Sequence, residues 1–271
     1  MLYRSELETA CRAARAAGEV VARHYARGPI AVEAKADDSP VTEADREANV
    51  VILELLRAAF PGDAILSEES PDDGARLAAE RVWIVDPLDG TRDFVQRTDD
   101  FAVHVGLAVA GEAVVGAVYL PVAQTLYAAA KGAGSYREDD RTRTRQPLVV
   151  SRTAERANVR IGISRHFLSD RLRACLDGAG ISERIPIGAS VKHMAVAAGE
   201  LDAVINLSAG EFEWDTCAPE VVLREAGGAY TDGAGQPFRY NQRDPGHARG
   251  SIASNGACHA ALVTLVGPYL P

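Results

Sequence analysis

The chain has 271 residues and a net charge of −9, with 47% apolar and 25% charged residues. This length allows one large or two medium-sized domains with an ample core, and the composition is that of a globular protein. The negative charge argues against a nucleic-acid polymer or an anionic membrane as the main partner. No apolar run approaches the length of a membrane-spanning helix, so membrane insertion is not expected.

The cysteine pattern bears on the cellular compartment. The four cysteines are scattered without a C-x-x-C pair, and the first 17 residues lack the apolar core of a signal peptide. We therefore expect reduced, buried thiols and a cytoplasmic protein. The cysteines are Cys11, Cys175, Cys217 and Cys258.

The first half of the chain predicts two helices followed by a series of strands. Apolar residues recur at helical spacing over 7–25, and a second helix begins at Thr42, where Asp45 follows as in a capping box. Turn signals between apolar runs after residue 100 predict an antiparallel meander. The segments 72–80 and 137–145 are polar, and we expect an exposed segment and a solvated loop or hairpin tip. The expected strands are 30–35, 64–66, 82–85, 101–109, 113–119 and 125–129.

The second half alternates strands and helices more regularly. Gly227-Gly228 ends a helix that starts at Trp214, as is typical of a C-terminal glycine. We interpret the chain as α+β in two layered halves, 1–150 and 151–271. The expected strands are 159–163, 185–187, 201–207, 229–231 and 251–254, and the expected helices are 167–176, 190–198, 214–226 and 258–266.

One stretch brings charge to the end of a buried strand. The apolar run 82–85 is followed by Asp86, which a proline keeps extended, and by the turn signal Asp89-Gly90. Thr91 is a good cap for a following helical turn. Carboxylates suit a hard cation and bare N–H groups suit a phosphate. Taken alone, such a stretch is most often a surface turn with solvated aspartates.

Three further acidic segments favour a metal site over a surface turn. Each places a carboxylate beside a core element, although Asp45 alone could be a capping residue and Asp215 alone an N-cap. Together they predict a site for two or three Mg²⁺ ions, because such close charges would otherwise destabilise the fold. Sites with two metal ions are suited to phosphoryl transfer with an activated water. The acidic residues are Asp45, Glu68, Glu69, Asp86, Asp89 and Asp215.

Three motifs in this order resemble the inositol monophosphatase superfamily of Mg²⁺-dependent, lithium-sensitive phosphatases. They are Ser67-Glu68-Glu69-Ser70, Asp86-Pro87-Leu88-Asp89-Gly90-Thr91 and Trp214-Asp215. The resemblance covers nearly the whole chain and implies a layered αβαβα sandwich. Within the superfamily, the segments 35–45 and 214–220 are closer to the 3'(2'),5'-bisphosphate nucleotidases, which act in sulfate assimilation. That resemblance implies hydrolysis of the 3'-phosphate of adenosine 3',5'-bisphosphate to AMP.

The resemblance also implies roles for individual residues. Glu68, Asp86 and the carbonyl group of Leu88 would bind the first metal, and Asp86, Asp89 and Asp215 the second. Glu68 would help to hold a third metal together with the water, which Asp45 and Thr91 would orient or deprotonate. Gly90 and Thr91 would hold the scissile phosphate, beside Leu88, Asp89 and Asp215. Without the motif, the choice between Glu68 and Glu69 stays open.

The substrate is less well defined than the metal site. Arg165, Ser190 and Lys192 resemble residues that line the nucleotide, and the two cations suit a second phosphate. Arg165 could equally be a surface cation, and His166 and His193 are expected to be structural. The alternatives are an inositol monophosphatase or fructose-1,6-bisphosphatase of relaxed specificity, and a non-catalytic sensor of a phosphorylated ligand. Relatives with these motifs include monomers and homodimers, so either state is expected.

Overall fold

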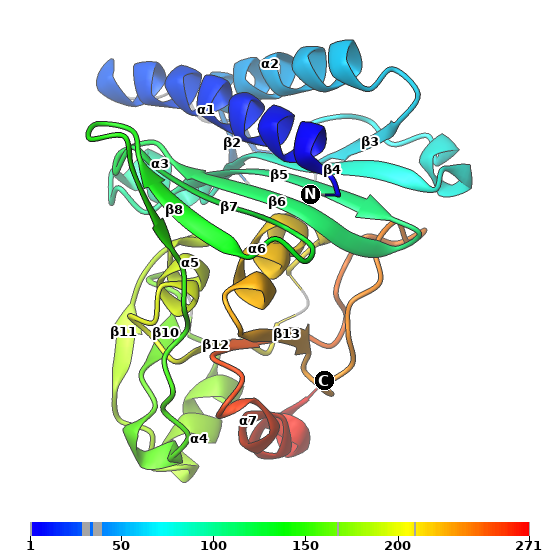
Figure 1. Cartoon of the computed structure of the whole chain (residues 1–271). Coiled ribbons are helices and arrows are strands. Elements are labelled where there is room, and N and C mark those ends of the chain that lie inside the picture. Colours follow the sequence, from blue (N-terminus) through cyan, green and yellow to red (C-terminus); the bar gives the residue numbers. More distant parts are fainter. Residues whose placement is uncertain (1, 29–32, 35–39, 167, 209, 271) are drawn as a thin grey trace.

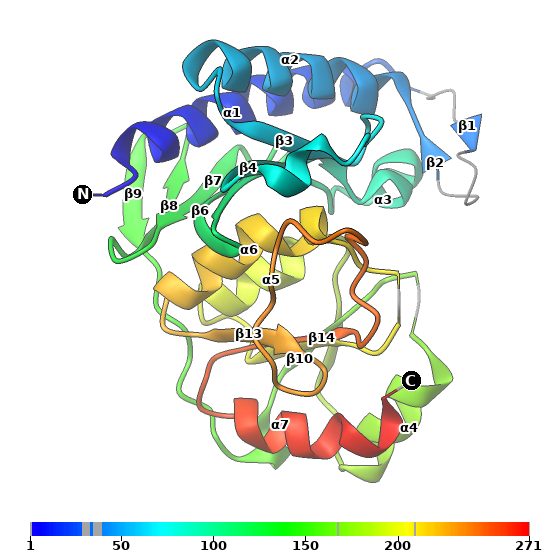
Figure 2. The same cartoon turned by 90° about the vertical axis from the view of Figure 1, so that its right-hand side faces the viewer.

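The computed structural model describes residues 2–28, 33–34, 40–166, 168–208 and 210–270. Its elements form five layers, which confirms the predicted αβαβα sandwich (Figures 1 and 2). None of the described helices combines the length and the apolar character needed to cross a bilayer. In order, the layers are helices α1 (Arg4–Ala26) and α2 (Glu43–Ala59), a seven-stranded sheet, helices α5 (Val191–Ala197) and α6 (Glu213–Glu225), a five-stranded sheet, and helices α4 (Asp170–Gly178) and α7 (His259–Val266).

The seven-stranded sheet contains the predicted meander. Its strands follow one another in chain order, with β3 parallel to β4 and every other neighbouring pair antiparallel. Helices α1 and α2 cover one face of this sheet and α6 the other. The strands are β3 (Ala64–Ser67), β4 (Arg81–Asp89), β5 (Ala102–Val109), β6 (Glu112–Leu120), β7 (Thr125–Ala130), β8 (Ser135–Asp139) and β9 (Thr144–Pro147).

Two polar segments lie largely as predicted. The charged run 137–145 contains the predicted hairpin tip, and it also includes the end of β8 and the start of β9 at the sheet edge, where backbone pairing needs no apolar pattern. The segment 72–80 contains a 3₁₀ turn, η1 (Ala75–Ala78). Most of this segment is exposed, as predicted, but Arg76 is buried because its guanidinium group pairs with Asp72 at 2.9 Å and donates to Asn241.

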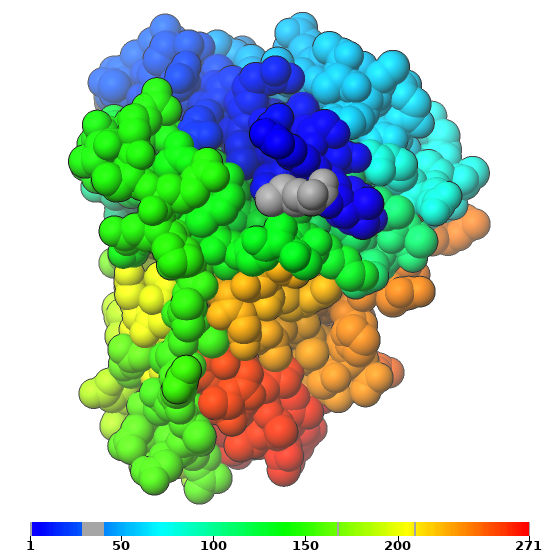
Figure 3. Space-filling model, in the orientation of Figure 1, coloured from blue at the N-terminus to red at the C-terminus, as the bar shows by residue number. Residues whose placement is uncertain are grey.

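The five-stranded sheet lies wholly in the second half of the chain. Its order is β11-β10-β12-β14-β13, and β10 is parallel to both of its neighbours. The space-filling view shows the first half packed directly on the second (Figure 3), while their status as separate domains stays a prediction. The strands are β10 (Ile161–Ile163), β11 (Arg184–Pro186), β12 (Ala203–Asn206), β13 (Ala229–Asp232) and β14 (Ser251–Ser254).

Several observed element boundaries differ from the predicted ones by a few residues. Helix α4 starts after the cap Ser169, whose hydroxyl accepts from the Leu172 N–H, so the predicted start at 167 is too early and itself lies outside the described residues. Of the predicted strand 30–35, only β1 (Glu33–Ala34) is described, paired with β2 (Pro40–Val41). All four cysteines are free and buried, as predicted.

Helix α6 is buried between the two sheets, and one glycine permits its close approach. At Gly116 of β6, a Cβ atom would come 2.3 Å from the backbone oxygen of Ala218. Any side chain at this position would therefore push α6 away from the seven-stranded sheet. Since α6 also carries Asp215, this contact fixes the distance between the two halves of the acidic site.

Asp202 joins the start of the second half to its central strand. Its fully buried carboxylate accepts hydrogen bonds from the backbone N–H and the guanidinium group of Arg160, at 2.8 and 2.9 Å, and from the Ser151 hydroxyl at 2.5 Å. Burial alone would raise the pKa of Asp202, but the hydrogen bonds from Arg160 and Ser151 outweigh it and lower the pKa to about 2. The ionised form therefore stabilises the fold.

The Asp202→Asn variant tests this stabilisation. At pH 7 we expect the free energy of unfolding to fall by about 2–3 kcal/mol, the usual cost of losing charge-assisted hydrogen bonds. A lowered folded-state pKa contributes stability above the unfolded-state pKa of about 3.9, and that contribution disappears as the pH falls towards 2. The difference between variant and wild type in urea unfolding should thus shrink between pH 5 and pH 3. A constant difference would contradict this role.

Candidate active site

Strand β4 delivers two aspartates to one end of the sheet interface. The strand continues beyond the predicted apolar run and includes both Asp86 and Asp89, with an irregularity in its pairing with β5 between them. The Leu88 N–H donates to Asp86 Oδ1 at 2.9 Å across this irregularity. A bulge of this kind re-aims side chains, so that two aspartates three residues apart serve one site.

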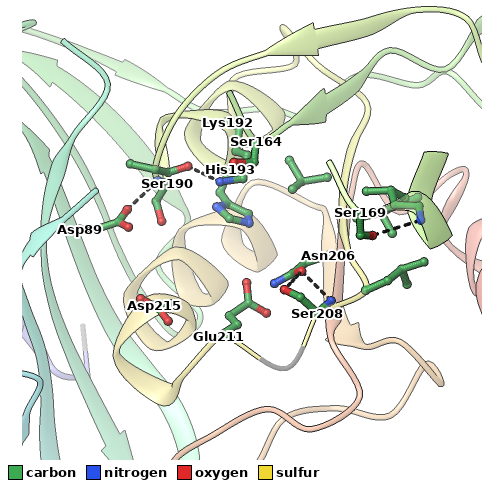
Figure 4. Close-up of a pocket in the computed structure, with 16 residues that line it drawn as sticks. Asp89, Ser164, Ser169, Ser190, Lys192, His193, Asn206, Ser208, Glu211 and Asp215 are labelled. Carbon is green, nitrogen blue, oxygen red and sulfur yellow. Dashed lines mark hydrogen bonds between the residues drawn. The ribbon is translucent and has the colours of Figure 1, made fainter. Parts of the chain in front are cut away.

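Asp215 comes to the same place from the second half of the chain. It is the third residue of α6, and its carboxylate accepts the Phe212 N–H at 2.6 Å in a capping arrangement, rather than acting as the N-cap itself. One oxygen each of Asp86, Asp89 and Asp215 lies within 4.8 Å of the others. Figure 4 shows Asp89 and Asp215 at the same end of a cavity.

The electrostatics of this group favour a bound cation. Burial and the charges of neighbouring carboxylates raise the pKa of Asp86 and of Asp215 well above the ordinary value. Burial would also raise the pKa of Asp89, but His104, Lys192 and a hydrogen bond from Ser190 lower it. Because all donors are oxygens and their mutual repulsion is strong, these residues fit a hard divalent cation.

Glu68 borders this group. It follows β3, is half-buried, and is not within the 4.8 Å mutual distance that joins the three aspartates. Its charge and a hydrogen bond nevertheless raise the pKa of Asp86, which places the two carboxyl groups side by side. The carbonyl oxygen of Leu88 lies 3.2 Å from the Thr91 hydroxyl, whose single hydrogen it shares with Asp45 Oδ1 as a second acceptor.

Asp45 and Thr91 meet although they lie far apart in the sequence. Asp45 Oδ2 accepts the N–H of Thr42 at 2.8 Å and its hydroxyl at 2.6 Å, which confirms the predicted capping box. Its other oxygen, Oδ1, lies 3.1 Å from the Thr91 hydroxyl. Burial is the main cause that raises the pKa of Asp45, to about 6. Capping and proton transfer can therefore share one carboxyl group.

Gly90, rather than Thr91, is the N-cap of helix α3 (Thr91–Gln96), so the predicted cap is wrong by one residue. The backbone of Gly90 has φ of 87°, a region that favours glycine. A Cβ atom here would come 2.7 Å from the Cβ of Ala189. Glycine thus lets the segment before Ser190 approach the end of β4.

Two of the three predicted substrate residues line the cavity. Ser190 and Lys192 belong to its wall; the Ser190 N–H donates to Asp89 Oδ2 at 2.5 Å, and Lys192 Nζ donates to the carbonyl of Ala189 at 2.5 Å. Arg165 is not among the residues that line the cavity and pairs instead with Asp100. Its proposed contact with a second phosphate therefore has no support from the geometry.

The structure adds three residues that motif reasoning did not assign. The buried His104 on β5 lies 3.3 Å from Asp89 Oδ2, and its other ring nitrogen lies 3.1 Å from the carbonyl of Trp214. His193 and Glu211 are buried in the cavity wall. A lone histidine in an apolar strand gives no sequence signal for such a contact. His166 bonds Asp93 at 2.8 Å, as expected of a structural histidine.

Comparison with known proteins accounts for this arrangement. The model of the inositol monophosphatase family matches residues 3–268. The chain belongs to this family. It is 35% identical over 247 residues to the 3'(2'),5'-bisphosphate nucleotidase CysQ of Escherichia coli. This alignment covers 88% of this chain and 95% of that protein. It is 40% identical over 211 residues to a 3'-phosphoadenosine 5'-phosphate phosphatase of Mycobacterium bovis, covering 74% and 72%.

The solved structures of this family include close matches to the fold. The CysQ structure from Bacteroides thetaiotaomicron superposes with a TM-score of 0.79 at 30% identity, over 94% of this chain and 98% of that one. The predicted resemblance to the inositol monophosphatase family is thereby confirmed. The carboxylate group at the end of β4 and α6 is thus a candidate metal centre in a family of phosphatases.

Proposed function

We propose that this protein is a Mg²⁺-dependent phosphatase that hydrolyses the 3'-phosphate of adenosine 3',5'-bisphosphate, releasing AMP. The observation that carries the proposal is the buried group Asp86, Asp89 and Asp215, two of which also line the cavity of Figure 4. The two relatives named above, a 3'(2'),5'-bisphosphate nucleotidase and a 3'-phosphoadenosine 5'-phosphate phosphatase at 35–40% identity, support a nucleotide bisphosphate as the substrate.

In the proposed reaction, Asp86, Asp89, Asp215 and Glu68 would hold two or three Mg²⁺ ions. When bound, these ions would supply charge stabilisation and make water more acidic. The chain's own groups would do the rest: Asp45 and Thr91, already 3.1 Å apart, would orient the attacking water, and Asp45 would take its proton. The water oxygen bonds to phosphorus, the bond to the ribose 3'-oxygen breaks, and that oxygen takes a proton from solvent water to leave as a hydroxyl group.

Substrate choice within the family is the first experiment. Phosphate release with Mg²⁺ should be measured side by side from adenosine 3',5'-bisphosphate, inositol 1-phosphate and fructose 1,6-bisphosphate. We expect kcat/KM to be at least tenfold higher for the nucleotide. Comparable rates on all three would favour a relaxed inositol or fructose-bisphosphate phosphatase, and would overturn the nucleotide assignment while leaving the metal site in place.

The same experiment addresses the sensor alternative. A non-catalytic sensor would bind a phosphorylated ligand without releasing phosphate from any of the three compounds. The presence of Glu68, Asp86, Asp89, Thr91 and Asp215 argues against it, since a degenerate relative should have lost at least one of these groups. Lithium sensitivity, a cytoplasmic location and a homodimer stay predictions.

A further inference from the structure

Beyond the acidic group, the cavity wall contains two buried polar atoms to which a ligand can hydrogen-bond. They are Oε2 of Glu211 and Nδ1 of His193, and neither has a hydrogen-bond partner within the described part of the chain. Both side chains are buried, at 7% and 4% exposure. An unpaired polar atom in such a place is costly, and buried groups of this kind are normally paired. In Figure 4 the Glu211 carboxylate faces the His193 ring inside the cavity.

The contacts of Tyr230 determine whether these two atoms donate or accept hydrogen bonds. Its hydroxyl lies 3.1 Å from His193 Nε2 and 3.4 Å from Glu211 Oε1. The phenol has one hydrogen, so both contacts are satisfied when Tyr230 donates to the carboxylate and His193 Nε2–H donates to the phenol oxygen. Burial and the charge of Lys192 lower the pKa of His193 and keep the ring neutral. His193 Nδ1 and Glu211 Oε2 are then both acceptors.

The position of these acceptors indicates which part of a substrate they meet. In the proposed function the scissile phosphate lies at Asp89 and Asp215. Glu211 stands four residues before Asp215, outside helix α6, and lines the same cavity. The remaining lining residues include Ser169, Asn206 and Ser208, which Figure 4 shows at the end away from Asp89, and the apolar Leu172 and Leu207. A group next to the phosphate-bearing carbon would therefore reach the acceptors first, and the base would lie beyond them.

We propose that Glu211, oriented by Tyr230, accepts a hydrogen bond from the ribose 2'-hydroxyl adjacent to the scissile 3'-phosphate, and so determines specificity for ribonucleotides. This inference rests on the proposed function. Burial raises the pKa of Glu211 although Ser251, Asn206 and Tyr230, through hydrogen bonds, and the charge of Lys192 act to lower it. A hydrogen bond donated by the substrate would further offset the cost of the buried charge. A site built around a buried acceptor rejects an analogue that lacks the donor.

The test compares adenosine 3',5'-bisphosphate with its 2'-deoxy analogue on four proteins. For the wild type we expect kcat/KM to favour the ribonucleotide by about tenfold or more. Glu211→Met, of similar length but without an acceptor, should lower this ratio to below about threefold. Tyr230→Phe, which keeps the carboxylate but removes the group that orients it, should lower the ratio by a smaller amount.

Glu220→Gln is the matched control. Glu220 is also buried and accepts from a tyrosine, Tyr240, but it does not line the cavity. It should keep the wild-type ratio, which separates recognition from a general effect on the fold. Equal rates on both nucleotides in the wild type, or an unchanged ratio in Glu211→Met, would overturn this inference alone. Turnover of inositol 1-phosphate but of neither nucleotide would instead overturn the proposed function.

Discussion

The Asp89→Asn variant is expected to lose turnover by about a thousandfold or more, equivalent to roughly 4 kcal/mol of transition-state stabilisation. Asp89 is one of three buried carboxylates whose oxygens lie within 4.8 Å of one another, and it also accepts the Ser190 N–H. An amide retains the shape and an acceptor but removes the charge that a divalent cation requires. The measurement is kcat/KM for adenosine 3',5'-bisphosphate at saturating Mg²⁺.

A second readout distinguishes a lost metal site from a lost fold. A ligand that binds only the folded state raises the melting temperature, so Mg²⁺ should stabilise the wild type and stabilise Asp89→Asn much less. Without Mg²⁺, the two proteins should show the same secondary structure. Asp202→Asn is the control with the opposite pattern, reduced stability with near-normal kcat. Near-normal turnover of Asp89→Asn would remove Asp89 from the site.

Replacing Asp45 with asparagine should lower kcat by about 10²–10⁴-fold, the usual contribution of a positioned acid or base. Asp45 Oδ1 lies 3.1 Å from the Thr91 hydroxyl, and only the carboxylate can take a proton from water. The amide can still accept the Thr42 N–H, so helix α2 should lose no more than about 1 kcal/mol.

The effect of Mg²⁺ on the melting temperature distinguishes the role of Asp45 from that of Asp89. Because Asp45 is not one of the three clustered carboxylates, Asp45→Asn should keep the Mg²⁺-dependent rise in melting temperature that Asp89→Asn loses. Glu43→Gln, an exposed change in the same helical turn, should leave kcat unaltered. A kcat of Asp45→Asn within tenfold of the wild type would exclude Asp45 as the proton acceptor.

Much of the fold was predictable because its signals are local. The helical spacing of apolar residues over 7–25 and the Thr42–Asp45 capping box both appear in the structure. The meander from β5 to β7 follows from apolar runs separated by turn residues. For the charged run 137–145 a hairpin tip was one of the two predicted possibilities, but the paired strands β8 and β9 were not predicted, because an edge strand is stabilised by backbone hydrogen bonds, which any side chain permits.

Some residues of the candidate site were also predictable from the sequence, and others were not. Asp86, Asp89 and Asp215 were identifiable because each stands beside the end of a predicted element, within a motif that resembles the family. The contact of Arg165 with Asp100 could not be foreseen, since a cation in a sequence does not reveal its nearest carboxylate. The unpaired carboxylate oxygen of Glu211 likewise appears only in the tertiary structure.

The order of most elements, the buried thiols and the set of carboxylates could be predicted from the chain alone, because periodicity, turn chemistry and motif spacing are properties of neighbouring residues. Tertiary structure alone decided that α6 packs against Gly116, so that Asp215 reaches the end of β4. It also decided that Tyr230 joins His193 to Glu211. Such contacts depend on how separate layers pack, and no local pattern in the chain records that packing.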